Sequence, residues 1–348
     1  MSILHKKNNC SFLDHYGFIS NIYKNINTNG QILSYVLSAK LFHILSNGHT
    51  LNRKRLKGKS SDDPHEEATK VRLKYEAVLL EIESNLKEKI HHKNNVSNVD
   101  NIRDFSKELL ERTIFDHVGT NGGNNSNTSV KHKIGNDDFL IPYNCRFYCG
   151  CVLEQCLKLE GNKYNIVIAD PPWWNKYIRR LKGSNNKLSY SMMYNEDIAS
   201  IPLKTLLATN CLVAVWCTNS PSNIAAVKNM IFPNWGVEYV ATWYWLKVDI
   251  QLKPVCPFST GSKKQPYERL IIGKVGDVTH VPDEHLFLSV PSALHSHKPP
   301  LVELLKEYIN EKNPEILELF ARYLLPNTCS VGYEPLKLQH TSLYEVVS

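Results

Sequence analysis

Asp170, Pro171, Pro172 and Trp173 are the residues whose types and spacing best suit chemistry. They follow an apolar run, residues 164–169, which is typical of a strand buried inside a parallel sheet. The run therefore places a carboxylate, two prolines and an indole where a strand leaves its sheet. In open α/β sheets this carboxyl edge is where ligands bind. The alternative is a plain Pro-Pro turn, with the aspartate as a cap and the tryptophan in the core.

These groups suit methylation of an exocyclic amino group on a nucleobase. Such an amine is a poor nucleophile because its lone pair is delocalised into the ring. Asp170 supplies one acceptor for its hydrogens, and the Pro171 carbonyl, held in direction by Pro172, supplies the other. Trp173 offers a face on which an unstacked base can lie. A fixed carboxylate would also stabilise the positive charge that moves onto the amine.

Length and composition set wide bounds on the class of protein. The 348 residues suffice for one sizeable core and an accessory region, and the net charge of +7 permits a polyanionic partner. The first residues lack the apolar core of a secretory signal, and no apolar run approaches the ~18 residues of a membrane span. Nine cysteines without such a signal indicate reduced thiols in an intracellular protein.

Four cysteines cluster and raise the question of a zinc site. They are Cys145, Cys149, Cys151 and Cys156. Their spacing is not the paired C-x-x-C of common structural zinc sites, so we expect no metal.

Residues 1–118 are predicted to form a helical accessory region. Residues 31–45 are apolar at helix-like spacing, and a second helix starts at Pro64 with Asp63 as its cap. The apolar stripe of this helix is Val71, Tyr75, Val78, Ile82 and Leu86. We expect the stripe to pack on the rest of the chain, while a coiled-coil dimer and a scaffold role stay open. The basic run 53–59 suits either nuclear import or RNA contact.

The fold class predicted for the remainder is α/β. Residues 119–135 are rich in glycine and asparagine and read as a flexible linker, and the domain itself is assigned to residues 136–348. In that domain apolar strands alternate with helices, which indicates a layered sheet. Strands are expected at 164–169, 211–217, 237–247, 269–273, 286–290 and 316–320, and helices at 195–208, 221–230 and 300–310.

Several stretches, taken in order, resemble the adenine N6-methyltransferases that carry the Asp-Pro-Pro-Trp motif, and most of all their methyltransferase-like protein 4 branch. The matching stretches are 166–173 with Asn175 and Lys176, 211–216 with Thr218 and Asn219, 243–247, Lys264 with 266–268, 270–273, 294–301, 317–322, and Leu336 with Lys337. The resemblance covers roughly the C-terminal three-fifths of the chain. It implies a Rossmann-like methyltransferase sheet with permuted motif order, preceded by an N-terminal helical extension.

The resemblance also implies S-adenosyl-L-methionine as the cofactor and assigns residues to it. The implied cofactor-binding residues are Gly150, Cys151, Val152, Asp170, Lys298, Phe320, Arg322 and Tyr333. Lys298 would contact the methionine end, while Phe320 and Arg322 would line the pocket. The chain departs from the family at Cys151, where an aspartate is usual, and at Tyr323 and Tyr333, where asparagines are usual. A changed polar contact would lower cofactor affinity without abolishing activity.

Two basic loops are candidates for nucleic-acid contact. Asn175, Lys176 and Arg179 follow the catalytic motif, and Lys264 lies near Tyr267, which could stack on a base. A base must leave its stack to reach Asp170, so single-stranded or loop adenosine in RNA is the expected target.

The function expected from these residues is N6-methylation of adenine in RNA by direct transfer. The resemblance suggests an internal 2′-O-methyladenosine of a spliceosomal small nuclear RNA. A DNA methyltransferase and a catalytically silent RNA-binding subunit are the alternatives. We expect a monomer located in the nucleus, with the cytoplasm as an additional location.

Overall fold

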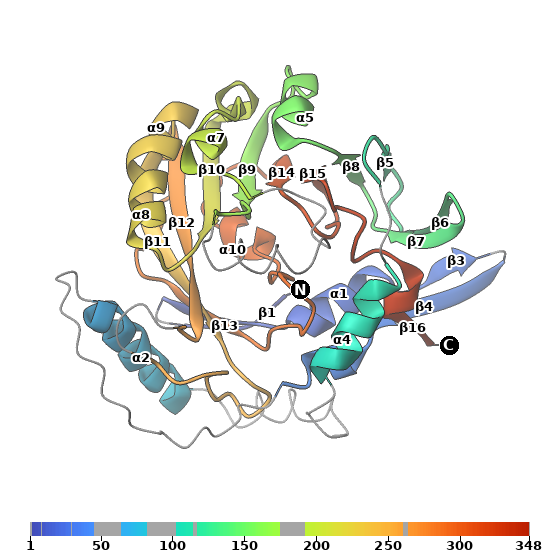
Figure 1. Cartoon of the computed structure of the whole chain (residues 1–348), viewed down its shortest axis with the longest axis horizontal. Helices are drawn as coiled ribbons and strands as arrows, with labels where there is room; N and C mark the ends of the chain where they lie inside the picture. Colours follow the sequence, from blue (N-terminus) through green and yellow to red (C-terminus); the bar gives the residue numbers. More distant parts are fainter. Residues whose placement is uncertain are drawn as a thin grey trace.

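The computed structural model describes residues 2–7, 9–28, 30–44, 64–81, 102–113, 117–174, 192–259 and 264–347. A sheet of 11 strands forms its centre (Figure 1). The strand order is β1 (Ile3–Lys7), β2 (Cys10–Leu13), β13 (Leu286–Ser289), β11 (Glu238–Lys247), β12 (Tyr267–Val275), β10 (Leu207–Cys217), β9 (Tyr164–Ala169), β14 (Ile316–Leu319), β15 (Thr328–Gly332), β8 (Cys145–Cys149) and β5 (Asn121–Asn124).

The middle of this sheet is parallel. Strand β9 lies between β10 and β14, and β15 and β8 continue in the same direction. Alternate residues of β9 face opposite layers: Val167 packs in one hydrophobic cluster and Ile166 in another, and both are 0% exposed. Burial on both faces explains why residues 166–169 of β9 are all apolar rather than alternating. The predicted strand 164–169 is confirmed.

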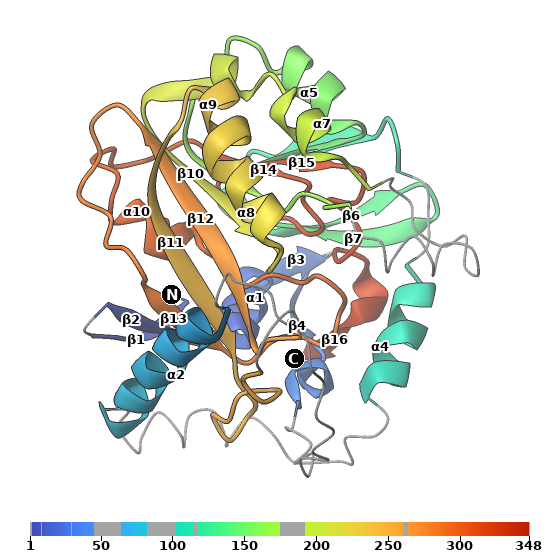
Figure 2. The ribbon, with the colours of Figure 1, turned by 60° about the vertical axis from the view of Figure 1, so that its left-hand side comes forward.

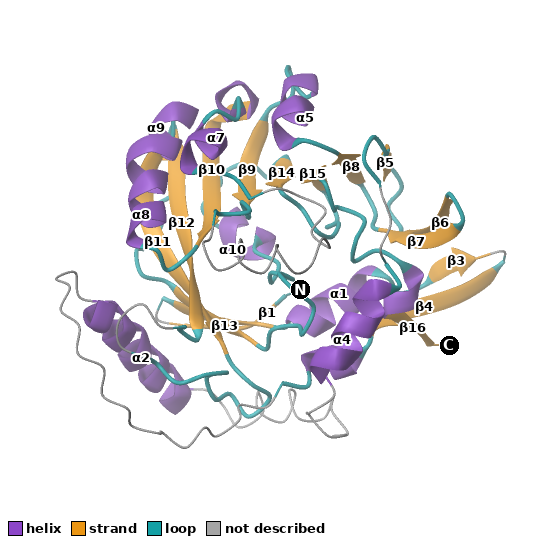
Figure 3. Ribbon diagram, in the orientation of Figure 1, coloured by secondary structure: helices purple, strands orange, loops and turns teal. Residues whose placement is uncertain are grey.

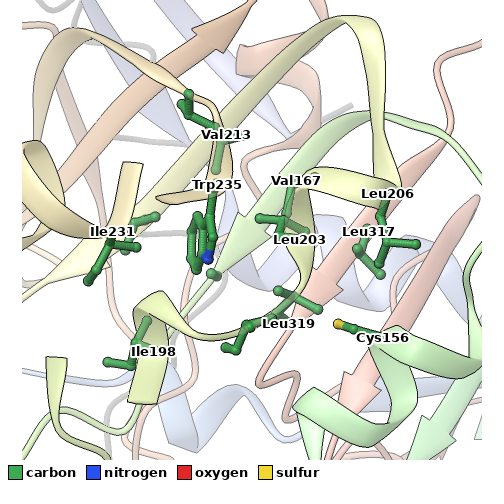
Figure 4. Close-up of a cluster of buried hydrophobic side chains, with 14 of the residues drawn as sticks. Cys156, Val167, Ile198, Leu203, Leu206, Val213, Ile231, Trp235, Leu317 and Leu319 are labelled. Atoms are coloured by element: carbon green, nitrogen blue, oxygen red, sulfur yellow. The ribbon is translucent and has the colours of Figure 1, made fainter. Parts of the chain in front are cut away.

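Helices cover both faces of the sheet (Figures 2 and 3). On one face lie α5 (Val152–Lys158), α7 (Asn195–Ala199), α8 (Pro221–Ala226) and α9 (Phe232–Trp235), with a π-helical turn at Val227–Ile231. Figure 4 shows their shared core, in which Ile198 and Trp235 pack with Val167 and Leu319 of the strands. The expected helix 195–208 is shorter than predicted, because α7 ends at Ala199 and a 3₁₀ turn at Leu203–Leu206 follows Pro202 before β10 begins at Leu207.

The opposite face is covered by α10 (Val302–Lys306). Its Leu304 and Leu305 are buried with Ile166 and Ile168 of β9. This helix follows directly on the segment that contains Lys298, so its packing fixes that segment against the sheet.

The predicted helical extension over residues 1–118 is not confirmed. Strands β1 and β2 lengthen the central sheet. Of the expected helix 31–45, the described residues 31–44 instead form β4 (Gln31–Leu37) and a 3₁₀ turn at Ala39–Phe42. Strand β4 pairs with β3 (Ile26–Thr28) and with β16 (Tyr344–Val347) from the other end of the chain. The local hairpin with β3 and the distant pairing with β16 together override the helix-like spacing. The helices of this region are α1 (His15–Ile22), α2 (Pro64–Glu81) and α4 (Ile102–Glu111).

Helix α2 starts at Pro64 as predicted and packs within the same molecule. Val71 and Tyr75 are 1% and 8% exposed in a cluster with β2, β11 and β13, and the Tyr75 hydroxyl donates to the carbonyl of Leu252 at 2.9 Å. The expected intramolecular contact is therefore confirmed. Ile82, Leu86 and the basic run 53–59 lie outside the described residues.

The predicted linker at 119–135 is wrong, because its residues pair as strands. Strand β5 pairs antiparallel with β8, and β6 (Val130–Ile134) forms a hairpin with β7 (Asp137–Ile141). A Cβ atom added to Gly122 would lie 2.8 Å from the Phe147 ring. Glycine is required here for close packing rather than for flexibility. Residues 136–348 therefore do not form a domain separate from residues 119–135.

The α/β class and the Rossmann-like character of the central sheet are confirmed by this mixed, helix-covered arrangement. The permuted order of the motifs stays a prediction.

Candidate active site

Asp170 stands at the carboxyl end of β9, in the middle of the sheet. Its backbone N–H donates to the carbonyl of Leu319 in β14 at 3.3 Å, which continues the strand pairing by one residue. Its side chain is 18% exposed. The carboxylate is thus held at the edge of the sheet that the sequence predicted.

The two prolines and Trp173 form a tight turn after Asp170. The Trp173 N–H donates to the Pro171 carbonyl at 2.8 Å, and the Met193 N–H donates to the Pro172 carbonyl at 2.9 Å. A carbonyl oxygen has two lone pairs, so the Pro171 carbonyl can still accept from a bound amine. The turn fixes its direction, as the sequence predicted.

The tryptophan of the motif is more buried than a stacking platform needs. Trp173 is 7% exposed and donates its indole N–H to the Trp216 carbonyl at 2.9 Å. The neighbouring Trp174 instead lies nearly parallel to Tyr194, with ring centroids 5.8 Å apart and an interplanar angle of 19°. Tyr194 is 57% exposed. These two rings are the aromatic faces beside the motif that the sequence reasoning missed.

Charged side chains surround the Asp170 carboxylate. Lys298 Nζ lies 3.6 Å from Asp170 Oδ1, and Arg322 Nη1 lies 4.0 Å from Asp170 Oδ2. Lys298 also donates to Glu268 Oε2 at 2.8 Å, and Lys247 binds the other oxygen of Glu268. The result is a row of alternating charges at the end of the sheet.

The charges in this row determine which groups are ionised. Burial alone would raise the pKa of Glu268, but Lys298 and Lys247 outweigh it and lower that pKa below its usual range. Burial alone would lower the pKa of Lys298, but the carboxylates of Asp170 and Glu268 raise it above its ordinary value. Both members of the Lys298–Glu268 pair are therefore charged at neutral pH.

Glu318 on β14 is a third acidic group near the site and behaves differently. Burial, and then the nearby Asp170 carboxylate, raise its pKa to about 8. Its Oε2 has no hydrogen-bond partner among the described residues, and neither has the hydroxyl of Ser330, its neighbour on β15. At pH 7 this shift favours the protonated, neutral form of the Glu318 carboxyl group.

One pocket, the Tyr333 pocket, has a volume of about 240 Å³ and adjoins the motif at Pro172. It gathers most of the residues that the resemblance assigned to the cofactor: Cys151, Val152, Phe320, Arg322 and Tyr333. Its acidic members are Asp197 and Glu334.

Three residues assigned to the cofactor do not line the Tyr333 pocket. Gly150 lies behind its wall, where its N–H donates to the Gly332 carbonyl at 2.7 Å, while Asp170 and Lys298 line the pocket described next. A Cβ atom on Gly332 would lie 3.0 Å from the Ala321 nitrogen, so glycine allows the two strand ends to approach. Phe320 has a positive φ of 61°, an uncommon conformation that turns the chain into the pocket.

Two of the three family departures, Cys151 and Tyr333, lie together, whereas the third, Tyr323, is buried and its hydroxyl donates to the Lys298 carbonyl at 2.9 Å. Burial raises the pKa of Tyr333, and the neighbouring Cys151 thiol raises it further. The aspartate and asparagine expected at these positions are thus replaced by two groups that contact each other.

A second pocket, the Asp170 pocket, has a volume of about 310 Å³. Its lining residues include Asp170, Trp173, Trp216, Asn219, Lys247, Lys264, Tyr267, Glu268 and Lys298. Lys264 is exposed at this pocket, as a nucleic-acid contact requires. Tyr267 does not offer the predicted stacking face, because it is 2% exposed and its hydroxyl donates to Glu67 at 2.9 Å. Asn175, Lys176 and Arg179 lie outside the described residues.

Glu268, Lys247, Asn219 and Glu318 belong to the site, but the sequence reasoning gave them no role. All four stood in the matched stretches, so their presence there was a usable signal. Apart from that match, no local feature shows that Glu318 is buried, since a single glutamate in a short strand is as easily an exposed residue.

The described residues contain no group of three or more histidine, cysteine or acidic side chains that could hold a metal ion. All nine cysteines are free thiols. Cys145 donates to the Pro142 carbonyl at 3.1 Å, and burial raises the pKa of Cys145, Cys149 and Cys156 to about 12. These thiols therefore stay protonated and pack in the hydrophobic core. In the described part of the chain, no helix is long and apolar enough to cross a bilayer.

The helix-covered sheet, with a carboxylate between two pockets at its carboxyl edge, defines a Rossmann-like methyltransferase domain. Comparison with known proteins agrees, because residues 164–334 match the MT-A70 family. These residues are an MT-A70 methyltransferase domain, and the chain resembles METTL4.

Three relatives illustrate the range of the match. The "N(6)-adenine-specific methyltransferase METTL4" of Homo sapiens is 37% identical over 251 residues, which are 69% of this chain and 51% of that protein. The "DNA N6-methyl methyltransferase" of Caenorhabditis elegans is 39% identical over 213 residues, 59% of this chain and 55% of that protein. The "N6-methyladenosine RNA methyltransferase MTA1" of Pyricularia oryzae is 30% identical over 186 residues, 51% of this chain and 49% of that protein. The chain spans about half the length of these relatives.

Proposed function

We propose that the protein methylates N6 of adenine in RNA, with S-adenosyl-L-methionine as methyl donor. The observation that carries the proposal is the position of Asp170. Its carboxylate lies between Arg322, which lines the Tyr333 pocket, and Lys298, which lines the Asp170 pocket. A group at this point can contact an amine in one pocket that receives a methyl group from the other.

The Tyr333 pocket fits the chemical groups of the donor. Val152 and Phe320 give an apolar wall for an adenine ring, and Arg322 gives a cation for a carboxylate. Tyr333 and Glu334 give polar atoms for ribose hydroxyls. When bound there, the donor supplies an electrophilic methyl group on a sulfonium. The residues present therefore fit the donor despite the change of Cys151.

The protein groups orient the amine and stabilise charge. Asp170 accepts one N6 hydrogen and the Pro171 carbonyl accepts the other, which favours a pyramidal nitrogen whose lone pair is less delocalised into the ring. As the amine becomes positive, the Asp170 carboxylate stabilises it without reorganisation, because Lys298 and Arg322 already hold it in place. Lys298 is in turn held by Glu268. After the methyl group is transferred, the amine loses one proton to solvent and becomes neutral N6-methyladenine.

A spliceosomal small nuclear RNA with an internal 2′-O-methyladenosine is the proposed target. Adenine as the base is supported by the likeness to the N(6)-adenine-specific methyltransferase METTL4, and RNA by the likeness to the RNA methyltransferase MTA1. Adenosines in single strands and loops are available without the energy of unstacking a duplex. DNA adenine is the second candidate, because a relative at 39% identity is named as a DNA methyltransferase. The exposed Lys264 at the Asp170 pocket supports either polyanion. We further propose that the protein acts as a monomer in the nucleus and also in the cytoplasm.

The experiment that tests the proposal uses the full chain and donor labelled in its methyl group. Matched RNA and DNA oligonucleotides, with adenosine or 2′-O-methyladenosine at one position, are incubated and digested to nucleosides. We expect label in N6-methyladenine, most strongly from 2′-O-methyladenosine in RNA. Equal transfer to DNA would favour the DNA function. Absence of transfer together with absence of donor binding would favour a silent RNA-binding subunit.

A further inference from the structure

Asn219 is an exposed side chain at the Asp170 pocket whose hydrogen-bonding direction is fixed by the protein. It lies two residues beyond the end of β10 and lines the pocket together with Asp170. Its Oδ1 accepts from Arg269 Nη1 at 2.6 Å. The preceding Thr218 is fixed as well, since its hydroxyl oxygen accepts from Asn223 Nδ2 at 2.8 Å.

The contact with Arg269 decides which way the Asn219 amide points. A guanidinium group only donates hydrogen bonds, so the amide atom that faces it must be the oxygen. The NH₂ group is then turned to the other side. Among the described residues no hydrogen bond uses Asn219 Nδ2, so this atom remains a donor for a molecule in the pocket.

Arg269 is itself held by a residue of α2. It is 6% exposed; its Nε donates to Glu67 Oε2 at 3.0 Å, and its Nη2 binds Glu67 Oε1. The Tyr267 hydroxyl donates to the same carboxylate. A buried arginine bound at two points cannot rotate freely, and it would be costly to leave unpaired. Glu67 lies outside the matched MT-A70 residues 164–334, so a separate helix sets this geometry.

We propose that Asn219 Nδ2 donates a hydrogen bond to a ring nitrogen of the target adenine, N1 or N7, and that Glu67 and Arg269 are its positioning residues. This inference rests on the proposed adenine methylation. In that reaction Asp170 accepts from the N6 amine, and the ring nitrogens beside that amine are both acceptors. A donor in the same pocket pairs with one of them, and a base with an N–H at that place would meet donor against donor.

Replacing one ring nitrogen of the base by C–H, and removing one side-chain amide from the protein, tests the contact directly. The natural chain and Asn219→Ala are each given single-stranded RNA with one adenine, 1-deazaadenine or 7-deazaadenine among pyrimidines. Methyl transfer gives kcat/KM, and fluorescence anisotropy gives the dissociation constant without turnover. For the natural chain we expect one of the two deaza bases to lower kcat/KM and affinity about 5- to 10-fold, the scale of one neutral hydrogen bond.

The coupling between the two changes is the deciding result. Asn219→Ala should lose the same factor on adenine and nothing further on the deaza base that the natural chain disfavours. Equal losses from Asn219→Ala on all three bases would overturn the inference. If the natural chain transfers no methyl group, the proposed function fails, while the binding measurements still decide whether Asn219 reads the ring nitrogen.

The positioning role of Glu67 has a matched control one residue away. Glu66 is 74% exposed and lies 3.7 Å from Lys70, so Glu66→Ala removes the same charge from the same turn of α2. We expect Glu67→Ala to raise the KM for RNA and to abolish the discrimination between adenine and its deaza analogue, with donor affinity unchanged. Glu67→Gln, which can still accept from Arg269, should restore part of the discrimination. Full discrimination in Glu67→Ala, or an equal loss in Glu66→Ala, would contradict the positioning role.

Discussion

Lys298 Nζ lies 3.6 Å from Asp170 Oδ1, although the two residues are far apart in the chain. Asp170 ends the central strand β9, and Lys298 lies in the segment that leads into α10, which packs on the same strand. The cation therefore holds the motif carboxylate at the border of the two pockets. This ion pair is the structural centre of the site.

Replacing Lys298 by methionine should impair both stability and transfer. The change leaves Asp170 and Glu268 without their shared cation, and removing one partner of a buried ion pair costs about 3 kcal/mol. The free energy of unfolding in urea and the rate of methyl transfer should both fall. Lys253→Met, at an exposed lysine, is the control and should change neither. An active and fully stable Lys298→Met protein would show that the pair is dispensable.

Because the pKa of Glu318 is raised in the folded protein, we expect the free energy of unfolding to fall as the pH rises. Its pKa is about 8 in the folded protein and near 4.5 when unfolded, so the native state keeps a proton that the unfolded chain releases between these values. The free energy of unfolding then falls by about 1.4 kcal/mol per pH unit across this window. Glu318→Gln, which imitates the neutral acid, should remove this slope in urea titrations, whereas the exposed Glu315→Gln should keep it. A slope that survives in Glu318→Gln would assign it to another group.

Because two histidines are buried in their neutral form, we expect the folded protein to become less stable in acid. His15 of α1 and His297 have ring centroids 4.5 Å apart, and none of their ring nitrogens has a hydrogen-bond partner among the described residues. Burial lowers the pKa of His297 to about 3, and burial followed by the charge of His297 lowers that of His15. Below pH ~6.5 the histidines of the unfolded chain bind protons, whereas the buried histidines of the native state stay neutral. The free energy of unfolding therefore falls as the pH falls below ~6.5.

Removing one of these histidines tests whether they cause the dependence of the free energy of unfolding on pH in acid. His297→Phe keeps an aromatic ring between His15 and Tyr323 and should reduce the slope by about 1.4 kcal/mol per pH unit below pH ~6. His132→Phe, at an exposed histidine of β6, serves as the matched change. Thermal unfolding at pH ~7 and pH ~5 gives the comparison, and identical slopes in all three proteins would refute the assignment.

We expect Tyr333 to weaken the binding of the methyl donor. In the family an asparagine is usual here, and Tyr333 instead contacts Cys151 at the edge of its pocket. Tyr333→Asn should tighten the binding of S-adenosylhomocysteine about 5-fold, since one polar contact is worth about 1 kcal/mol. Isothermal calorimetry measures this without turnover. Weaker binding by the asparagine variant would mean that tyrosine is itself a good ribose partner.

Sequence patterns predicted those parts of the fold that depend on burial and failed where pairing partners are distant. Strand β9 was recognisable because both its faces are covered, which leaves an uninterrupted apolar run at residues 166–169. Residues 31–45 were not, because their strand partners include β16 from the end of the chain. The glycine-rich residues 119–135 looked flexible, yet Gly122 is small because Phe147 packs against it.

Within the site, the residue types were predictable but their exposure was not. Asp170 and the Tyr333 pocket lie as expected, since the strand ends determine them. Trp173 and Tyr267 are aromatic residues beside the site, but neighbours that are remote in sequence decide which rings are buried. The stacking of Trp174 on Tyr194 and the neutral Glu318 carry no local signal.

The most direct measurement compares the natural chain with Asp170→Asn in methyl transfer to RNA, with donor binding measured in parallel. Asparagine keeps the size of the side chain but removes the negative charge that stabilises the developing cation. We predict a loss of at least ~10²-fold in kcat, with donor affinity within a few-fold of the natural chain. Transfer at the natural rate by Asp170→Asn would contradict the central role of this carboxylate.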